Sequence, residues 1–200
     1  MIRFPDGVRL VLASASPRRS ELLGSVGLEF VVIPADIDES VGEGESPRDY
    51  VARLSREKAA KVVELLADGS IVVAADTTVD VGGQILEKPA DDDDARRMLR
   101  LLSGRTHLVH TGVTVSGPDG VGNDRSETIV VETSVSFVEL TESAIGWYLS
   151  TCEHVGKAGA YGIQGAAGVF VERIDGSVTN VIGLPLAETV AMLRSATTGR

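Results

Sequence analysis

The chain has little of what marks a secreted or membrane-spanning protein. Its 200 residues include one cysteine, Cys152, so no disulfide can form within the chain, and no nucleophile signature surrounds it. No stretch approaches the roughly 18 apolar residues of a membrane-spanning helix. Residues 1–7 lack the apolar segment of a secretion signal. We therefore expect a cytoplasmic protein that makes no membrane contact.

Basic residues are also scarce. The chain has 19 Lys and Arg against 29 Asp and Glu, a formal net charge of −10. This balance argues against nucleic acid as a partner, because a duplex binds to an electropositive face. The histidines, His107, His110 and His154, lack the spacing of metal ligands, and the first two should point to opposite sides of one strand. We interpret all three as structural.

With 43% hydrophobic residues the chain can bury a core, and we expect residues 1–200 to form one domain, with two lobes as an option. Strands and helices interleave, some strands through hairpins, which predicts a mixed α/β sheet with flanking helices. The expected strands are 8–13, 30–34, 71–75, 79–81, 84–86, 107–115, 128–138 and 169–174. The expected helices are 17–26, 47–66, 91–102, 142–150 and 186–193, with a polar loop at 117–126, an irregular glycine-rich segment at 156–168 and a frayed tail at 195–200.

The most informative segment is 12–23, Leu-Ala-Ser-Ala-Ser-Pro-Arg-Arg-Ser-Glu-Leu-Leu. It predicts a strand end, a tight corner and a helix with Ser16 at the N-cap and Pro17 at the first position. Arg18 and Arg19 then lie in the first turn, where the helix dipole is already positive, so a bound anion such as phosphate would explain both. The alternative is a solvated helix start whose arginines pair with nearby carboxylates.

A lysine interrupts the apolar stripe of the expected helix 47–66. The stripe consists of Val51, Leu54, Val62 and Leu65, and Lys58 lies in its middle. An ammonium there must reach solvent along the helix edge, pair with a carboxylate, or face an anion in a cleft. Reaching solvent and facing an anion carry equal weight.

Asp76 follows the apolar strand 71–75, at the end where ligands of α/β sheets gather. Its carboxylate can bind a metal or take a proton from water, whereas an ordinary role would be to close a turn or cap a helix. A two-residue turn at Gly82-Gly83 places Val81 opposite Gln84, and counting outward places Thr77 opposite Lys88. Lys88 would then lie beside Asp76, as a plain ion pair or as a phosphate-binding cation.

Two loops carry further candidates. Asp36, Asp38 and Glu39 cluster in one acidic loop, which is solvated in the simplest interpretation but holds Mg²⁺ or orients an arginine if it folds over the Ser16–Arg19 corner. The segment 157–165, Lys-Ala-Gly-Ala-Tyr-Gly-Ile-Gln-Gly, allows close backbone approach to a ligand. Within it, Tyr161 offers a ring for stacking and Gln164 an amide suited to a base edge.

Taken in order, these segments resemble the Maf family of nucleotide pyrophosphatases. The matching stretches span nearly the whole chain: 12–23, Glu57-Lys-Ala59, Ala75-Asp-Thr77, Lys88-Pro89, Leu102-Ser-Gly-Arg-Thr-His107, Thr111-Gly-Val113, 157–165 and Asn180-Val-Ile-Gly-Leu-Pro185. The resemblance implies a mixed α/β fold with a cleft between two lobes, related to inosine triphosphate pyrophosphatases. It also implies cleavage of a nucleoside triphosphate between its α and β phosphates with a divalent metal, Mg²⁺ or Mn²⁺. Proteins of this family are often homodimers.

The resemblance also assigns roles to individual residues. Asp76 matches the position of the proton acceptor. Our own candidates for the metal ligands are Glu39 and Asp76, because carboxylates can bind an ion that also contacts phosphate oxygens. Positions implicated in substrate binding or catalysis correspond to Ser14, Arg18, Arg19, Glu39, Lys58, Lys88 and Gln164, with Tyr161 and Lys157 in the same loop as Gln164. The forms Ala-Asp-Thr and Tyr-Gly-Ile-Gln resemble the branch that acts on dTTP and UTP.

The chain departs from the family pattern at Gly156, where Asp is usual, and at Glu87, where Gly is common; both leave the base preference open. Modified pyrimidine triphosphates are a further substrate option. The alternative function is a nucleotide-sensing regulator of septum formation with slow hydrolysis.

Overall fold

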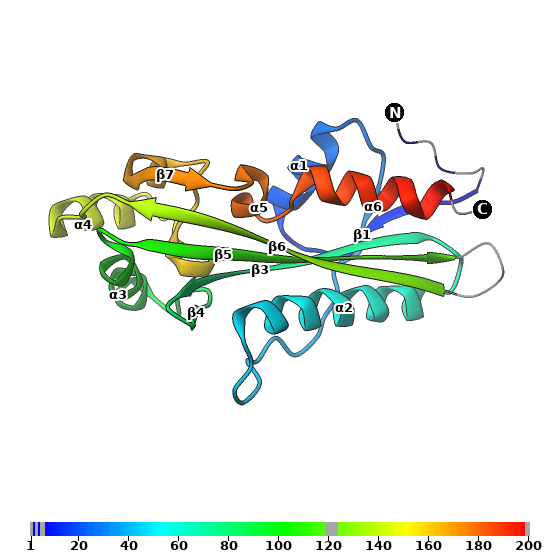
Figure 1. Cartoon of the computed structure of the whole chain (residues 1–200), viewed down its shortest axis with the longest axis horizontal. Helices are drawn as coiled ribbons and strands as arrows, with labels where there is room; N and C mark the ends of the chain where they lie inside the picture. Colours follow the sequence, from blue (N-terminus) through cyan, green and yellow to red (C-terminus); the bar gives the residue numbers. More distant parts are fainter. Residues whose placement is uncertain (1, 3, 5–6, 119–123, 199–200) are drawn as a thin grey trace. The chain divides into compact units, whose positions relative to one another are not determined.

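The computed structural model describes residues 2, 4, 7–118 and 124–198. It has a mixed α/β fold in which one seven-stranded sheet, with strand order β2-β1-β3-β5-β6-β7 and β4 paired with β3, is flanked by helices (Figure 1). The chain divides into two compact units. Unit 1 comprises Met1–Asp76, Thr111–Val131 and Gly183–Arg200, and unit 2 comprises Thr77–His110 and Glu132–Ile182.

Unit 1 is built on a parallel core. Strand β1 pairs in parallel with β2 and with β3, in the register Leu12–Val32 and Leu12–Val73. The elements of this unit are β1 (Leu10–Leu12), α1 (Pro17–Ser25), β2 (Val31–Val32), α2 (Pro47–Leu66), α6 (Leu186–Thr198) and parts of β3 (Ile71–Val81), β5 (Thr106–Pro118) and β6 (Asp124–Phe137). No helix in the described ranges has the length and apolar character needed to cross a membrane.

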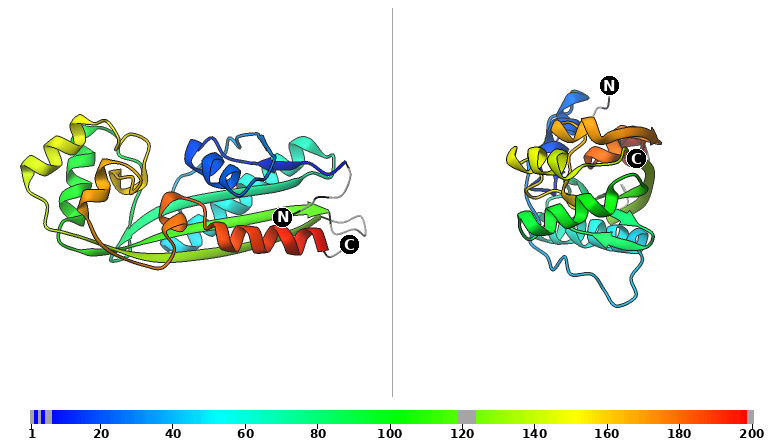
Figure 2. Two further views of the ribbon diagram at one scale, coloured as in Figure 1. Left: turned by 90° about the horizontal axis from the view of Figure 1, so that it is seen from above. Right: turned by 90° about the vertical axis from the view of Figure 1, so that its left-hand side faces the viewer.

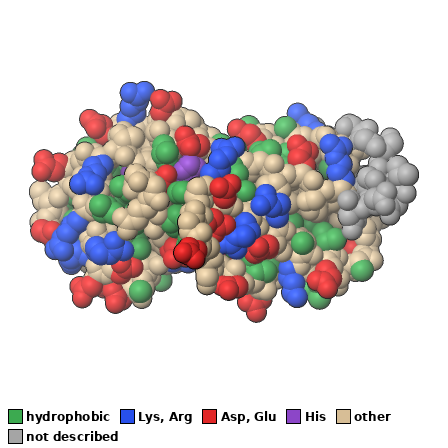
Figure 3. Space-filling view, turned by 60° about the horizontal axis from the view of Figure 1, so that its bottom comes forward, with side chains coloured by type: hydrophobic (Ala, Val, Ile, Leu, Met, Phe, Trp, Pro, Cys, Tyr) green, Lys and Arg blue, Asp and Glu red, His purple; other side chains and the backbone are tan. Residues whose placement is uncertain are grey.

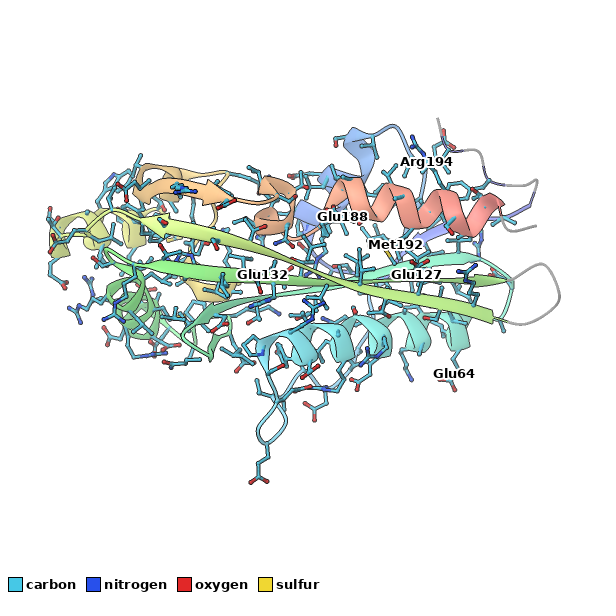
Figure 4. The ribbon with its side chains drawn as sticks, in the orientation of Figure 1. Glu64, Glu127, Glu132, Glu188, Met192 and Arg194 are labelled. Carbon is cyan, nitrogen blue, oxygen red and sulfur yellow. The ribbon has the colours of Figure 1, made fainter. Side chains whose placement is uncertain are left out.

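Helices cover both faces of the unit 1 sheet. Helix α2 lies along one face (Figure 1), and its side chains Val51, Leu54 and Val62 are buried. On the other face α1 and α6 contribute Leu23 and Met192 to a core that includes Ile71 and Val73; Met192 is labelled in Figure 4. The stripe predicted for α2 is confirmed except at Leu65, which is 68% exposed.

Close packing of α2 on the sheet depends on Gly112 of β5. A Cβ atom at this position would lie 2.2 Å from the carbonyl oxygen of Val51. Glycine therefore lets the helix backbone approach the strand directly. This contact fixes the position of α2, and with it the side chains that α2 carries.

Unit 2 combines the other ends of the long strands with short elements. Its further elements are β4 (Gln84–Leu86), α3 (Asp92–Leu102), α4 (Glu142–Ser150), the 3₁₀ turns Ala158–Ala160 and Ala166–Phe170, β7 (Val171–Asp175) and α5 (Val178–Ile182). Helices α3 and α4 contact each other and appear in green and yellow-green in Figure 2. Residues Met98, Leu99, Ile145 and Phe170 belong to one buried core.

The helices 47–66 and 142–150 were predicted with the bounds that the structure has, and the hairpin register Val81–Gln84 is confirmed. Other predicted bounds were wrong. The long strands extend to Pro118 and start at Asp124, so the expected loop 117–126 is partly strand, while residues 119–123 lie outside the described residues. Helix α6 continues to Thr198 where a frayed tail was expected, because Ala196 still packs on the core. Asp76 lies inside β3, as discussed below.

Candidate functional site

The corner between β1 and α1 holds the first part of the site. Helix α1 begins after Ser16 with Pro17 at its first position, as predicted, but the Ser16 hydroxyl makes no capping bond. Instead, the hydroxyl of Ser14 accepts hydrogen bonds from the Ser16 amide at 3.2 Å and from Nη1 of Arg19 at 3.1 Å. No acidic residue occupies the first turn of α1. The positive end of this helix thus carries Arg18 and Arg19, without a carboxylate in the same turn.

The second part of the site is a lysine between two carboxylates. The Nζ atom of Lys58 lies 2.6 Å from Oδ1 of Asp76 and 2.6 Å from Oε1 of Glu39. The side chains of Lys58 and Asp76 are 8% and 11% exposed, whereas that of Glu39 is 40% exposed. Of the three options stated for Lys58, this structure therefore shows pairing with carboxylates.

Glu39 reaches the site because α2 anchors its loop. The hydroxyl of Tyr50 donates to the Glu39 carbonyl at 2.9 Å, and Nη2 of Arg53 donates to the Ser40 carbonyl at 2.9 Å. Arg53 also binds both carboxylate oxygens of Glu45, each at 2.7 Å, and these bonds raise the pKa of Arg53. Sequence reasoning missed these two anchors. The available signal was their i, i+3 spacing on the helix that follows the acidic loop.

Arg19 connects the two parts electrostatically. Its Nε donates to the Gly183 carbonyl at 2.9 Å. Burial lowers the pKa of Arg19, and the negative charges of Asp76 and Glu39 oppose this shift, while Arg18 adds to it. Arg19 therefore lies within electrostatic range of both carboxylates and of its neighbouring arginine. The guanidinium keeps its charge in a protein.

The predicted place of Asp76 needs a correction. The prediction put Asp76 at the end of its own strand, but β3 continues to Val81 because Thr77, Thr78 and Val79 favour extended backbone. It is β1 that ends here, opposite Val73. Asp76 thus lies beyond the carboxyl end of β1, close to Ser14 in the parallel register, and α/β sheets commonly bind ligands at such strand ends.

Lys88 is not on the hairpin ladder. The ladder of β3 with β4 ends at Val79–Leu86, before it reaches the expected pair of Thr77 with Lys88. Beyond β4, the carbonyl of Glu87 accepts the amide of Gly159 at 3.1 Å. Lys88 belongs to unit 2, as do the remaining candidates.

The loop 157–165 of unit 2 is braced from inside. The Nζ of Lys157 donates to the Glu153 carbonyl. The Lys157 side chain also packs against Gly162, where an added Cβ would lie only 2.6 Å from Cε of Lys157. Oε2 of Glu153 accepts the Ala166 amide at 2.8 Å. Gln164, between these braces, is exposed. The loop therefore presents the Gln164 amide to its surroundings from a fixed backbone.

Tyr161 does not offer a free ring for stacking. It is 6% exposed and packs edge-on against His107 and Phe137, with ring centroids 5.4 and 4.9 Å away. Its hydroxyl lies 2.8 Å from Nε2 of His107, and burial raises its pKa. This placement makes Tyr161 a core residue that supports the loop, because an aromatic ring enclosed on its faces cannot stack on a base.

The three histidines have the structural settings that were expected. His107 belongs to the aromatic cluster, and His154 lies 2.9 Å from Asp92. His110 lies between Asp80 and Glu132 of unit 2, at 3.4 and 3.6 Å; Glu132 is labelled on β6 in Figure 4. Among the described residues, no group of three or more His, Cys, Asp and Glu side chains is placed to hold a metal ion.

Comparison with known proteins identifies the family. A family model described as Maf-like protein matches residues 9–196. This chain belongs to the Maf family. A dTTP/UTP pyrophosphatase of Anaeromyxobacter dehalogenans (strain 2CP-C) is 56% identical over 94% of this Maf-like chain and 94% of the relative. The dTTP/UTP pyrophosphatase of Myxococcus xanthus (strain DK1622) is 50% identical over 96% of this chain and 94% of the relative. That of Brucella abortus (strain 2308) is 52% identical over 92% of this chain and 90% of the relative.

Among solved structures, the Staphylococcus aureus Ham1 protein aligns with 67% of this chain and 72% of its own, with 19% identity and a TM-score of 0.45.

Proposed function

We propose that the protein hydrolyses nucleoside triphosphates between the α and β phosphates, with dTTP and UTP as substrates. The reaction consumes one water and yields a nucleoside monophosphate, pyrophosphate and a proton. One observation carries the proposal: in unit 1 a helix N-terminus with two arginines lies in electrostatic range of two carboxylates that converge on one cation. The relatives that match this chain are dTTP/UTP pyrophosphatases, and the choice of substrates rests on them.

The β1–α1 corner would hold the triphosphate. Amide groups at the start of α1 and the guanidinium groups of Arg18 and Arg19 offer donors suited to phosphate oxygens. The Ser14 hydroxyl orients Arg19, which the Gly183 carbonyl holds from the other side. Phosphate would thus meet a preorganised donor set, which is the main requirement for this class of transfer.

The carboxylates fit a divalent cation bound together with phosphate. Oxygens of Glu39 and Asp76 both contact the same Lys58 ammonium, so they point toward one positive charge. Mg²⁺ is commonly held by one or two carboxylates plus substrate phosphates, and oxygen ligands suit Mn²⁺ equally. When bound, the ion would supply charge neutralisation at the phosphates. Glu39 and Asp76 would hold it.

Asp76 would also orient the attacking water and accept its proton. The carboxylate is nearly buried and lies on β3, a central strand of the sheet. A fixed carboxylate can act as general base when a water lies within hydrogen-bond reach. Lys58 would move its ammonium to phosphate oxygens as the triphosphate binds, since its side chain is flexible.

In unit 2, Gln164 would read the base. Its exposed amide carries both a donor and an acceptor, which match the polar edge of a pyrimidine. Lys88 would supply a further phosphate contact. Lys157 and Tyr161 would hold the loop, since both side chains are engaged within unit 2.

The test is a product assay with a set of common and modified nucleoside triphosphates under Mg²⁺ and Mn²⁺. We expect monophosphate and pyrophosphate from dTTP and UTP, and a loss of about 10²–10⁴-fold in rate for Asp76→Asn, the usual cost of removing a positioned base. Asp36→Asn, an exposed carboxylate near the same loop, is the matched control. Tight nucleotide binding without turnover would instead show a sensor, and wild-type turnover in Asp76→Asn would remove Asp76 from the reaction.

A further inference from the structure

The Lys58 ammonium occupies the point on which both candidate metal ligands converge. It lies 2.6 Å from an oxygen of Glu39 and 2.6 Å from an oxygen of Asp76. These separations are those of short charge-assisted hydrogen bonds. A divalent cation that used the same two oxygens could not bind while the ammonium remains there. Lysine and metal therefore compete for one position.

The site also has too few protein ligands to hold a metal by itself. The described residues contain no group of three metal-binding side chains. Arg19 interacts electrostatically with both carboxylates, and Arg18 adds a second positive charge next to it. A free divalent ion would thus enter beside three positive side chains, whereas an ion that brings a triphosphate also brings the negative charge that balances them.

We propose that Lys58 is an internal counter-cation that keeps divalent metal out of the nucleotide-free site, so that metal and triphosphate bind as one complex. The inference rests on the proposed function for the identity of the anion. The competition between lysine and metal involves only Lys58, Glu39 and Asp76, which all belong to unit 1.

The consequence is a coupling between metal and nucleotide. Arrival of the triphosphate offers the ammonium new oxygen partners and releases the two carboxylates. By linkage, the nucleotide must then raise the affinity for metal by the same factor as metal raises the affinity for nucleotide. In the absence of nucleotide, the affinity for metal should depend on whether a cation stands at position 58.

The test measures Mn²⁺ binding to the free protein by electron paramagnetic resonance, which needs no turnover. We expect weak binding to the wild type, and an affinity roughly 5- to 150-fold higher for Lys58→Met, the usual range of such couplings. Lys58→Arg, which keeps the charge, should bind Mn²⁺ as weakly as the wild type. Lys61→Met, which removes an exposed lysine one turn along α2, is the matched control and should leave Mn²⁺ affinity unchanged.

Two further measurements make the result decisive. The double variant Glu39→Gln/Lys58→Met should lose the gained affinity, because one of the two carboxylates is gone. If Lys58→Met is too unstable for titration, its melting temperature should rise with Mn²⁺ far more than that of Lys61→Met. For the wild type, a non-hydrolysable α,β-methylene analogue of dTTP should raise Mn²⁺ affinity.

Equal Mn²⁺ affinity of Lys58→Met and wild type would overturn the proposal, as would tight Mn²⁺ binding to the nucleotide-free wild type. These outcomes are independent of the product assay. A protein that fails to release pyrophosphate but gains Mn²⁺ affinity on loss of Lys58 would refute the proposed function and retain the counter-cation.

Discussion

A buried ammonium is unfavourable unless charges surround it, and Lys58 is surrounded by two. Removing one partner of a buried pair leaves an uncompensated charge, which is far worse than the pair itself. The Glu39–Lys58–Asp76 arrangement is therefore a stable ligand-free state that can exchange its central cation. The same three residues stabilise one another while the site holds no ligand, and they would bind the metal and the triphosphate when these arrive.

His107 gives a pH dependence at the scale of one side chain. Burial lowers the pKa of His107 from 6.5 to about 4, and its Nδ1 has no hydrogen-bond partner among the described residues. Because the folded pKa lies below the unfolded one, the unfolded chain binds more protons between pH 6.5 and 4. The free energy of unfolding should therefore fall as the pH falls through this window, by roughly 2 kcal/mol between pH 7 and 4.5.

Urea unfolding of wild type and His107→Gln at both pH values measures this contribution. The glutamine cannot titrate, yet its amide can reach the Tyr161 hydroxyl. The wild type should lose roughly 2 kcal/mol more than the variant on acidification. Equal losses in the two proteins would show that His107 does not titrate on unfolding.

Several site residues were predictable because they violate a local rule. Lys58 interrupts an apolar stripe, and Arg18 and Arg19 stand where a helix disfavours cations. The partners of these residues were not predictable, since the Lys58–Glu39 pair depends on how Tyr50 and Arg53 anchor a loop. Tyr161 violates no such rule. Its hydroxyl makes it look suited to a binding site, although its ring is buried in the core.

At the scale of elements, capping and periodicity determined the helices well. Ser46 accepts the Asp49 amide at 3.1 Å, and Pro47 follows it, so α2 starts where the sequence indicates. Strand ends were harder to predict, because polar residues such as Asp76 and Asp80 continue inside β3. Their pairing is set by neighbouring strands far away in sequence, which a local pattern does not contain.

The packing of α2 on β5 predicts the effect of Gly112→Ala. The new Cβ would meet the Val51 carbonyl, a backbone group that cannot rotate away. We expect destabilisation of at least about 1–3 kcal/mol in urea unfolding, as for other overpacked sites. We also expect a reduced pyrophosphatase rate, because α2 carries Lys58. Gly24→Ala on α1 is the control: its Cβ would meet nothing nearer than 3.9 Å, so its stability should be unchanged or slightly higher.

The brace in the 157–165 loop predicts a separation of KM from kcat. Glu153→Ala removes the acceptor of the Ala166 amide, so Gln164 would lose its fixed backbone. We expect KM for dTTP to rise while kcat changes little, because ordering the loop then opposes binding. Glu153→Gln keeps an acceptor oxygen and should restore KM.

A second substitution checks the same brace from the other side. A Cβ on Gly165 would lie 1.9 Å from Oε2 of Glu153, so Gly165→Ala must displace the carboxylate. It should raise KM as Glu153→Ala does. An unchanged KM in both variants would show that the brace does not support binding.

At the scale of the whole molecule, the surface and the site have opposite charge character. The chain carries a net charge of −10, and acidic and basic side chains are intermixed on the face drawn in Figure 3. The cations of the site are few and local. A small polyanion can be bound by such a cluster, whereas a long polyanion also meets the repulsion of the surrounding acidic surface.

This contrast predicts discrimination by size among anions. Inorganic tripolyphosphate should inhibit dTTP hydrolysis competitively, because it fits the cluster that holds the triphosphate. A 20-base-pair DNA duplex should neither inhibit nor bind at about 100 μM in 0.15 M salt, where even non-specific DNA-binding proteins are largely bound. Fluorescence anisotropy of labelled duplex and a pyrophosphate release assay measure the two effects. Duplex binding with a steep salt dependence would mean that basic residues elsewhere form a continuous surface, and the net charge would then be no guide to the partners of this protein.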